Sequence, residues 1–243
     1  MRRFAFIVTL AALFVGPLPA EAQSDAPRVY SAYFKVDFPD IPAWIENYQT
    51  TEVPIFDALV EEGVLTDYGL WVHDTGGEYN LQMNMIAPSW DALGDFWDAY
   101  FERLPPEVMA EGSAMIRKHT DEIWTIATPP AEGGAGGAFI YESAWHIAYD
   151  QLEAYDEDFE QYAAPILEQA VADGLITGWA KLGHDTGGPW NVKLLYWMDS
   201  WDNADDLIAR LGEGREGMDP EAMRSARAHE DHVWRSVPRT PGM

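Results

Sequence analysis

The segment HDTGGEYN at residues 73–80 recurs as HDTGGPWN at residues 184–191, which is 111 positions further along the chain. The same spacing relates Pro54 to Pro165. A shared spacing across separate motifs means that two copies of one unit align without a gap over much of their length. The chain is therefore a tandem repeat, and its fold is the fold of the repeated unit.

Apolar periodicity predicts the elements of that unit. Residues 29–36 alternate as a strand does, and the apolar residues between Asp40 and Gly63 keep helical spacing. Pro54 falls inside this helix, so we expect a kink or a break there. The remaining elements are two strands at 65–72 and 79–87, a helix that Ser89 caps, a polar and helical segment at 106–118, and a last strand at 123–127.

The resulting order is strand, helix, strand, strand, helix, strand, which is the ferredoxin-like unit of the α+β class. We expect four parts: a signal peptide at 1–22, repeat one at 29–127, a Gly/Pro/Ala linker at 128–138 and repeat two at 139–237. Asp150 and Glu153 form a plausible capping box at the start of the second repeat. Residues 238–243 are expected to be disordered.

Composition and charge bound the location and the partners. The basic start, the short apolar run and the small residues Ala20 and Ala22 are typical of a secretory signal, so we expect a soluble periplasmic or secreted protein. With 41 acidic against 15 basic residues, the net charge is −26, which disfavours nucleic acid and membrane partners. The absence of Cys excludes disulfides and thiolate chemistry. The sequence leaves open whether the protein is a monomer or a homo-oligomer.

The repeated unit resembles the dimeric α/β-barrel superfamily. The features that carry the resemblance are the element order, the central proline, the glycine after the first helix, the Gly-rich hairpin ending in Asn and the Trp-Asp pair that opens the second helix. That superfamily includes antibiotic-biosynthesis monooxygenases, the EthD and NIPSNAP groups, stress-responsive barrel proteins, and the haem-using chlorite dismutases and dye-decolourising peroxidases. The resemblance extends over residues 29–237 and matches no single family. It implies a barrel closed within one chain, with a cavity between the two sheets where relatives bind small, often aromatic molecules.

Two histidine motifs are candidate sites. The His-Asp pair in each hairpin, at His73 and His184, suggests a metal or a general base, but at a hairpin the Asp caps its own turn and Gly supplies positive φ, so we favour a structural role. The Arg-x-His-x-Asp pattern contains His119 and His229. We favour a structural role at a helix end for these residues too. We expect no metal and no cofactor, with haem on one of these two histidines as the alternative.

The differences between the copies indicate where a single function would lie. Polar residues that alternate with the helix-packing residues should point into the barrel, where they need partners, water or a ligand. His146 is the candidate general acid or base, because the unperturbed pKa of a histidine side chain lies near the working pH. The predicted ligand-binding residues are Tyr33, Lys35, Gln82, Asn84, Lys193, Trp197 and Trp234.

Three functions stay open at this stage. The first is binding of a small aromatic or polar molecule, with an acid group that Lys35 or Lys193 could pair. The second is a cofactor-independent monooxygenase, isomerase or lyase acting on such a molecule. The third is a structural protein that only assembles with others. A cavity without His146 and a nearby carboxylate or Tyr would speak against catalysis, and a barrel filled by side chains would leave no room for a ligand.

Overall fold

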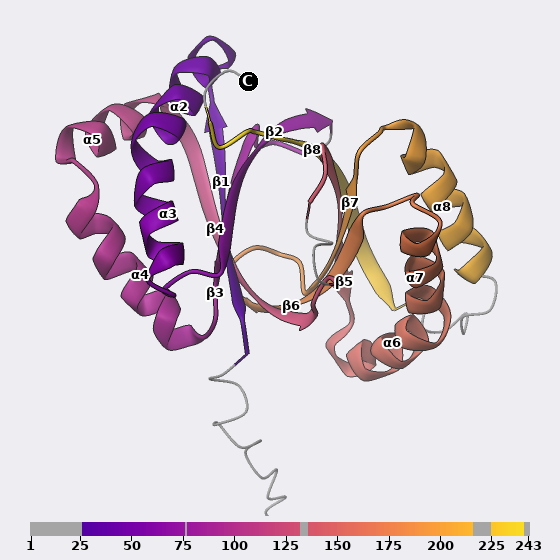
Figure 1. Ribbon diagram of the computed structural model, residues 1–243. Helices are drawn as coiled ribbons and strands as arrows, with labels where there is room; N and C mark the ends of the chain where they lie inside the picture. Colours follow the sequence, from indigo (N-terminus) through magenta and orange to yellow (C-terminus); the bar gives the residue numbers. More distant parts are fainter. Residues whose placement is uncertain (1–25, 76, 132–135, 216–224, 241–243) are drawn as a thin grey trace, which may run out of the picture.

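The computed structural model describes residues 26–75, 77–131, 136–215 and 225–240. Eight strands form one closed barrel, and the helices of the two halves flank it on opposite sides (Figure 1). The predicted signal peptide and part of the predicted linker lie outside the described residues. Among the described residues, no helix is long and apolar enough to cross a membrane.

The first half contains strands and helices in the order that the apolar pattern predicts. Its elements are β1 (Arg28–Val36), α2 (Ile41–Asn47), α3 (Val53–Glu61), β2 (Asp67–Thr75), β3 (Leu81–Ala87), α4 (Trp90–Arg103), α5 (Pro106–Met115) and β4 (Ile116–Thr128). A short 3-10 turn, Phe38–Asp40, precedes α2.

The second half repeats this order. Its elements are β5 (Phe139–Ile147), a 3-10 turn (Tyr149–Gln151), α6 (Leu152–Asp158), α7 (Ala164–Ala172), β6 (Gly178–Thr186), β7 (Val192–Met198), α8 (Asp202–Arg215) and β8 (Ala226–Ser236).

The strand order around the barrel is β1-β3-β2-β8-β5-β7-β6-β4, and every pairing is antiparallel. Two of these pairings, β2 with β8 and β4 with β6, join one half to the other, and we call them the seams. Closure leaves no strand edge free to pair with another chain. Two tandem ferredoxin-like repeats thus form an intrachain α/β barrel, which confirms the predicted fold class.

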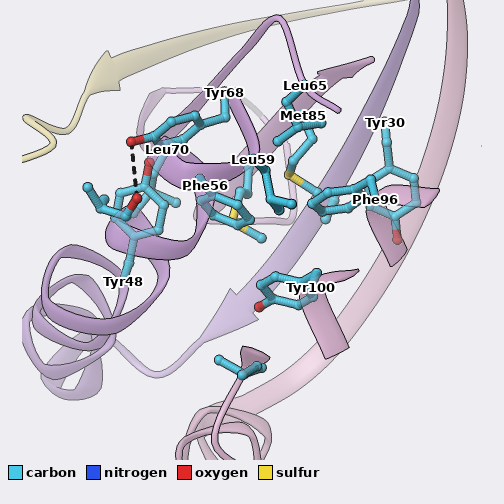
Figure 2. Packing of buried hydrophobic residues seen from close by; sticks show 14 of the residues in the cluster. Tyr30, Tyr48, Phe56, Leu59, Leu65, Tyr68, Leu70, Met85, Phe96 and Tyr100 are labelled. Atoms are coloured by element: carbon cyan, nitrogen blue, oxygen red, sulfur yellow. Dashed lines mark hydrogen bonds between the residues drawn. The ribbon is translucent and has the colours of Figure 1, made fainter. Parts of the chain in front are cut away.

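Each strand separates two apolar regions. On β1, Tyr30, Ala32, Phe34 and Val36 pack against the helices of the first half, whereas Val29 and Tyr33 point into the barrel. In the helix layer, the Tyr100 ring stacks on the rings of Phe56 and Phe96 (Figure 2). Phe56 and Phe96 are fully buried, and burying one such side chain stabilises a fold by roughly 1.5–3 kcal/mol.

The central prolines break the first helix of each half, as predicted. A π-helical turn, Tyr48–Glu52, separates α2 from α3, and Pro54 lies in the first turn of α3. The second half has the same turn at Phe159–Ala163, before Pro165. Proline cannot donate the backbone hydrogen bond that a continuous α-helix needs, so the backbone widens before it.

Three local predictions were wrong. The last strands are longer than the apolar pattern indicates, since β4 begins at Ile116. The capping box is absent, because α6 begins after Gln151 and has no side-chain cap. Part of the predicted disordered end is ordered: Arg239 donates to the Asp67 carboxylate and to the Tyr68 carbonyl oxygen. The predicted Ser89 cap is confirmed, since its Oγ accepts from the Ala92 amide at 3.1 Å.

Candidate functional site: a polar cavity at the hairpin end of the barrel

The two HDTGG hairpins lie at the same end of the barrel and cover it. Gly77 and Gly188 occupy equivalent positions in the two copies and both have positive φ, at 43° and 64°. A Cβ on Gly77 would lie 2.3 Å from the His232 ring, and a Cβ on Gly188 would lie 2.0 Å from a Glu122 carboxylate oxygen. Each hairpin therefore needs glycine for its turn and for its close approach to the last strand of the other half.

The aspartates of the same motif hold the seams. The Asp74 carboxylate accepts from Arg235 at 3.0 Å and from the Trp201 indole at 2.8 Å, and both partners lie in the second half. The equivalent Asp185 in the second half binds the first half: its carboxylate accepts from the Thr125 hydroxyl and pairs with Arg28. These contacts support the predicted structural role, and they add a partner that was not predicted: among the described residues, both carboxylates bind the opposite half.

Beneath the hairpins lies a cavity of about 280 Å³, which we call the hairpin-end cavity. Its lining comes from both halves and combines carboxylates, aromatic rings and one lysine. The lining residues are Tyr33, Glu78, Tyr79, Thr120, Glu122, Glu142, Gly188, Pro189, Trp190, Lys193, Glu230, His232 and Trp234.

The floor of this cavity is a buried hydrogen-bonded network centred on Lys193. Its Nζ lies 2.7 Å from Glu122 Oε2, 3.3 Å from Glu142 Oε1 and 2.5 Å from the Tyr33 hydroxyl. The Gln82 amide nitrogen donates to the Tyr33 hydroxyl at 3.1 Å and to Glu142 Oε2 at 3.0 Å. The three charged side chains are at most 5% exposed, so they interact in an environment that screens charge far less than water does.

The network determines the protonation of its members. Burial alone would lower the pKa of Lys193, but the charges of Glu142 and Glu122 outweigh burial and raise it, so the ammonium form is retained. Burial and the same two carboxylates raise the pKa of Tyr33 well above its usual value. Tyr33 therefore stays a neutral phenol, which accepts from Lys193 and donates to Glu142 at 3.3 Å.

The network occupies positions at which the two copies differ. The repeat spacing relates Lys193 to Gln82 and Tyr33 to Ala144. It also relates Glu142 to Ser31. In the last strands the spacing is 110, as between His119 and His229, and it relates Glu122 to His232 and Trp124 to Trp234. The packing of the repeat therefore does not require these polar groups, because the other copy does without them at the matching position.

One consequence of this asymmetry is an unpaired donor. The indole of Trp124 donates to Glu122 Oε2 at 3.1 Å. Its counterpart Trp234 has His232 where Trp124 has Glu122. The Trp234 side chain is 1% exposed, and its Nε1 has no hydrogen-bond partner among the described residues. A buried polar group without a partner is rare enough to suggest a missing ligand or water.

The structure places the predicted ligand-binding residues at different depths. Tyr33, Lys193 and Trp234 line the hairpin-end cavity, and Gln82 bonds to the network below it. Asn84 and Trp197 instead line a second cavity of about 250 Å³ at the other end of the barrel, the linker-end cavity. This second cavity is mostly apolar, and Asn84 connects it to the network by accepting from Gln82 at 3.5 Å.

Lys35 and His146 line neither cavity. Both precede the last residue of their strands, at the hairpin end. His146 Nδ1 lies 3.0 Å from the carbonyl oxygen of Pro189, and Lys35 lies over the exposed ring of Phe38. The expectation that both face the chamber is therefore not met, and their roles in binding or catalysis stay predictions.

The histidines of the repeated motifs do not converge. His119 and His229 lie on the outer face of β4 and β8, not at a helix end as predicted, and each bonds to the Asp two residues later. His73 packs edge-on against Trp234 and His184 against Trp124, on opposite seams. The described residues contain no group of three or more His, Cys, Asp or Glu side chains that could hold a metal ion.

Sequence reasoning missed the two carboxylates of the network. Glu142 is not among the predicted site residues, and Glu122 precedes the predicted last strand at 123–127, whereas the observed strand begins at Ile116. The alternation of Glu122 with Trp124 is a signal that could have found it. Tyr79 and Trp190, equivalent aromatic residues of the two hairpins, were also missed as cavity walls.

Comparison with known proteins supports the fold and leaves the family open. No protein-family model and no curated protein sequence matches the chain. Solved structures do match over most of its length. A candidate monooxygenase from Fusobacterium nucleatum has a TM-score of 0.60 at 6% identity, covering 88% of this chain and 93% of its own.

Two further solved structures have the same shape. A candidate monooxygenase from Lactobacillus acidophilus has a TM-score of 0.57 at 12% identity, covering 88% of this chain and 95% of its own. An anthrone oxidase-like protein has a TM-score of 0.53 at 9% identity, covering 89% and 93%. The chain therefore has the ferredoxin-like α/β-barrel fold of these proteins, and identities this low establish the fold alone.

Proposed function

We propose that this protein binds a small organic molecule in the hairpin-end cavity. The observation that carries the proposal is a cavity of about 280 Å³ whose floor is a buried ionic network, built at positions where the two copies differ. A barrel that needed only to be stable would be more simply filled by apolar side chains, since buried ion pairs are weak stabilisers.

The size and lining of the cavity support this function. Pockets for drug-sized ligands span about 300–1,000 Å³ and combine apolar walls with a few placed polar groups. The volume of the hairpin-end cavity lies just below this range, and two of its aromatic residues, Tyr79 and Trp190, come one from each hairpin. The monooxygenase-like and oxidase-like neighbours in the fold comparison are consistent with a small-molecule ligand.

The proposal is tested by measuring binding to wild type and to variants of the cavity wall. A panel of small aromatic molecules is screened by thermal shift and confirmed by isothermal titration. Trp190→Ala should weaken binding of any hit, whereas Phe101→Ala, which removes an exposed ring from the outer face of α4, should not. Equal binding by wild type and Trp190→Ala would remove the cavity assignment.

A second candidate function is cofactor-independent catalysis in the same cavity. Its support is the placement of Tyr33 between Lys193 and Glu142, because a phenol held between an ammonium and a carboxylate can pass a proton between them. Glu142 would then take the role that the sequence assigned to His146. Turnover of a bound molecule that Tyr33→Phe abolishes without changing affinity would support catalysis, and unchanged turnover would contradict this assignment.

Haem stays the alternative cofactor. The two histidines that the sequence offered for it, His119 and His229, lie on the outer face of β4 and β8. His232 lines the hairpin-end cavity, and its Nδ1 has no hydrogen-bond partner among the described residues. A proximal ligand needs a histidine that can face the macrocycle, and His232 is the better placed of the three. Absorbance of the protein purified from its own cells tests this directly, since a Soret band would support haem and its absence would contradict it.

We also propose that the protein is exported after removal of residues 1–22. The support is the sequence of this segment alone. Mass spectrometry of the protein recovered from the periplasm or the medium should show a chain that begins at Gln23. An intact chain confined to the cytoplasm would contradict export.

A further inference from the structure

Carboxylates outnumber cations around the hairpin-end cavity. Among the described residues, Lys193 is the one lysine or arginine that lines it, against the four carboxylates Glu78, Glu122, Glu142 and Glu230. Glu78 is already paired with Lys118 at 2.5 Å, which leaves three carboxylates to one lysine. Lys193 is within 3.3 Å of both Glu122 and Glu142, so one ammonium faces two buried carboxylates and one negative charge is left over. His232, whose Nε2 is 3.7 Å from Glu230, adds a positive charge only when protonated.

This charge balance disfavours the acidic ligand that the sequence suggested. Lys193 already has two carboxylate partners, and Lys35 does not line the cavity. An added carboxylate would lose its hydration and meet a surplus of negative charge. A cation entering the same space would be attracted by that surplus.

The walls of the cavity are suited to a cation as well. Tyr33, Tyr79, Trp190 and Trp234 line it, and aromatic faces attract ammonium groups. Two of these rings already contact a lysine ammonium group within the protein. The Lys118 ammonium lies 5.4 Å from the centre of the Tyr79 ring, and the Lys193 ammonium lies 5.0 Å from that of Tyr33.

A second and independent observation is the unpaired indole N–H of Trp234. Trp234 lines the cavity, it is 1% exposed, and no described residue accepts from its Nε1. Its counterpart Trp124 donates to Glu122, which lines the same cavity. The equivalent position beside Trp234 is held by His232, which offers no carboxylate and whose Nδ1 also has no partner among the described residues. A ligand that carries an acceptor oxygen would supply the partner that Trp234 Nε1 lacks.

We propose that the hairpin-end cavity selects a small organic amine in its cationic form that also carries a hydrogen-bond acceptor. The ammonium group binds among Glu142, Glu230 and the aromatic rings, and the acceptor oxygen binds Trp234 Nε1. This inference rests on the proposed function and names the ligand class for it.

The test compares ligands that share a skeleton and differ in charge. The probes are 2-phenylethylamine, 2-phenylethanol and phenylacetate, titrated calorimetrically at pH 7 into the full chain. The amine should bind about tenfold or more tighter than the alcohol, as expected from one charge-compensating contact in a partly desolvated site. Phenylacetate should bind least. A phenylalaninol probe, which adds a hydroxyl to the amine, should bind tighter than 2-phenylethylamine, and Trp234→Phe should remove that gain.

Variants separate the cavity from the overall negative charge of the protein. Glu142→Gln removes one carboxylate from the network, and Glu111→Gln makes the same charge change on the exposed surface of α5. Glu142→Gln should weaken the amine about tenfold while the alcohol is unchanged, and Glu111→Gln should change neither. Circular dichroism establishes that each variant is folded, and Glu230→Gln replaces Glu142→Gln if the latter is not.

The outcomes distinguish this inference from the proposed function. Binding of phenylacetate or phenylethanol as tight as that of the amine would overturn the cation preference while leaving the cavity as a ligand site. Equal weakening by Glu142→Gln and Glu111→Gln would also overturn it, because the attraction would then be non-specific. If none of the three probes and no member of the aromatic panel binds, the proposed function itself fails.

Discussion

Lys193 is the residue on which the interior of the barrel depends most. Its ammonium group is the shared partner of Glu122, Glu142 and Tyr33, which come from three different strands. In the other copy the same position is Gln82, which cannot neutralise a carboxylate. Breaking a buried ion pair by removing one partner is strongly destabilising, because the other charge is left in a low-dielectric environment.

We therefore predict that Lys193→Met lowers the free energy of unfolding by about 3–5 kcal/mol. Urea titration at pH 7 measures the change. The double variant Lys193→Met with Glu122→Gln should recover part of the loss, since it removes one of the two stranded charges. A loss below about 1 kcal/mol for the single variant would show that water reaches the network and screens it.

Glu52 is a half-buried carboxyl in the helix layer of the first half. Its Oε2 accepts from the Tyr100 hydroxyl at 3.0 Å, and burial raises its pKa from 4.5 to about 7 although that hydrogen bond opposes the change. The folded protein thus binds this proton more tightly than the unfolded chain. The associated stability is complete below pH 4.5 and is lost as pH rises through about 7.

We predict that Glu52→Gln removes this pH dependence. The difference in unfolding free energy between Glu52→Gln and wild type should grow in favour of the variant from pH 4.5 to pH 7. Chemical unfolding at several pH values measures it. Glu46→Gln, an exposed change in the preceding helix, is the matched control and should follow wild type. A constant difference would mean that Glu52 is hydrated in the folded state.

At the scale of elements, the two seams hold the halves together. Asp74 on β2 binds Arg235 on β8 and Trp201 at the start of α8. Asp185 on β6 binds Arg28 on β1 and Thr125 on β4. Burial would raise the pKa of Asp74, but the hydrogen bonds from Trp201 and Arg235 outweigh it and lower the pKa. The stability that Asp74 contributes is therefore present at neutral pH and lost as pH falls through its depressed pKa.

We predict that Asp74→Asn lowers the free energy of unfolding by about 1–2 kcal/mol at pH 7, as expected for partly exposed charged hydrogen bonds. Asp95→Asn on the exposed face of α4 should change it little. The difference in unfolding free energy between Asp74→Asn and Asp95→Asn should become smaller in acid. Denaturant titrations at pH 7 and at pH 3 give both values, and a gap that widens in acid would contradict the assigned role of Asp74.

The elements themselves were largely predictable from the sequence. The period-2 alternation of β1, the glycine after α3 and the proline at its start are local signals, and the structure confirms all three. The start of β4 was not predictable in this way. Residues 117–122 are all polar or charged and show no apolar alternation, although the pairing of β4 with β1 makes them a strand. Tertiary pairing there outweighs local pattern.

At the scale of the whole molecule, the sequence predicts which face a residue occupies but not its depth along the barrel axis. Alternation places Lys35 and Tyr33 on the same face of β1, yet only Tyr33 reaches the cavity. Depth depends on how the strands tilt and on the stagger of strand pairing across the seams, which are properties of the closed barrel. For the same reason no local signal brings Glu122 and Glu142, from different halves, to one lysine.

The closed barrel also predicts that the halves depend on each other. A chain of residues 26–131 alone would expose the edges of β2 and β4 and the inward face that carries Trp124. We expect it to self-associate or precipitate, and to recover native secondary structure when refolded with residues 136–243. Size-exclusion chromatography and circular dichroism measure both properties. A stable monomer of residues 26–131 would contradict mutual dependence.

The central claim is that the two halves enclose a ligand chamber beneath the hairpins. A crystal structure of the protein grown with 2-phenylethylamine tests it most directly. The account predicts the amine between the Tyr79, Trp190 and Trp234 rings, with its ammonium group within hydrogen-bond distance of a cavity carboxylate. Amine bound only on the outer surface, with the chamber occupied by water or by rearranged side chains, would contradict it.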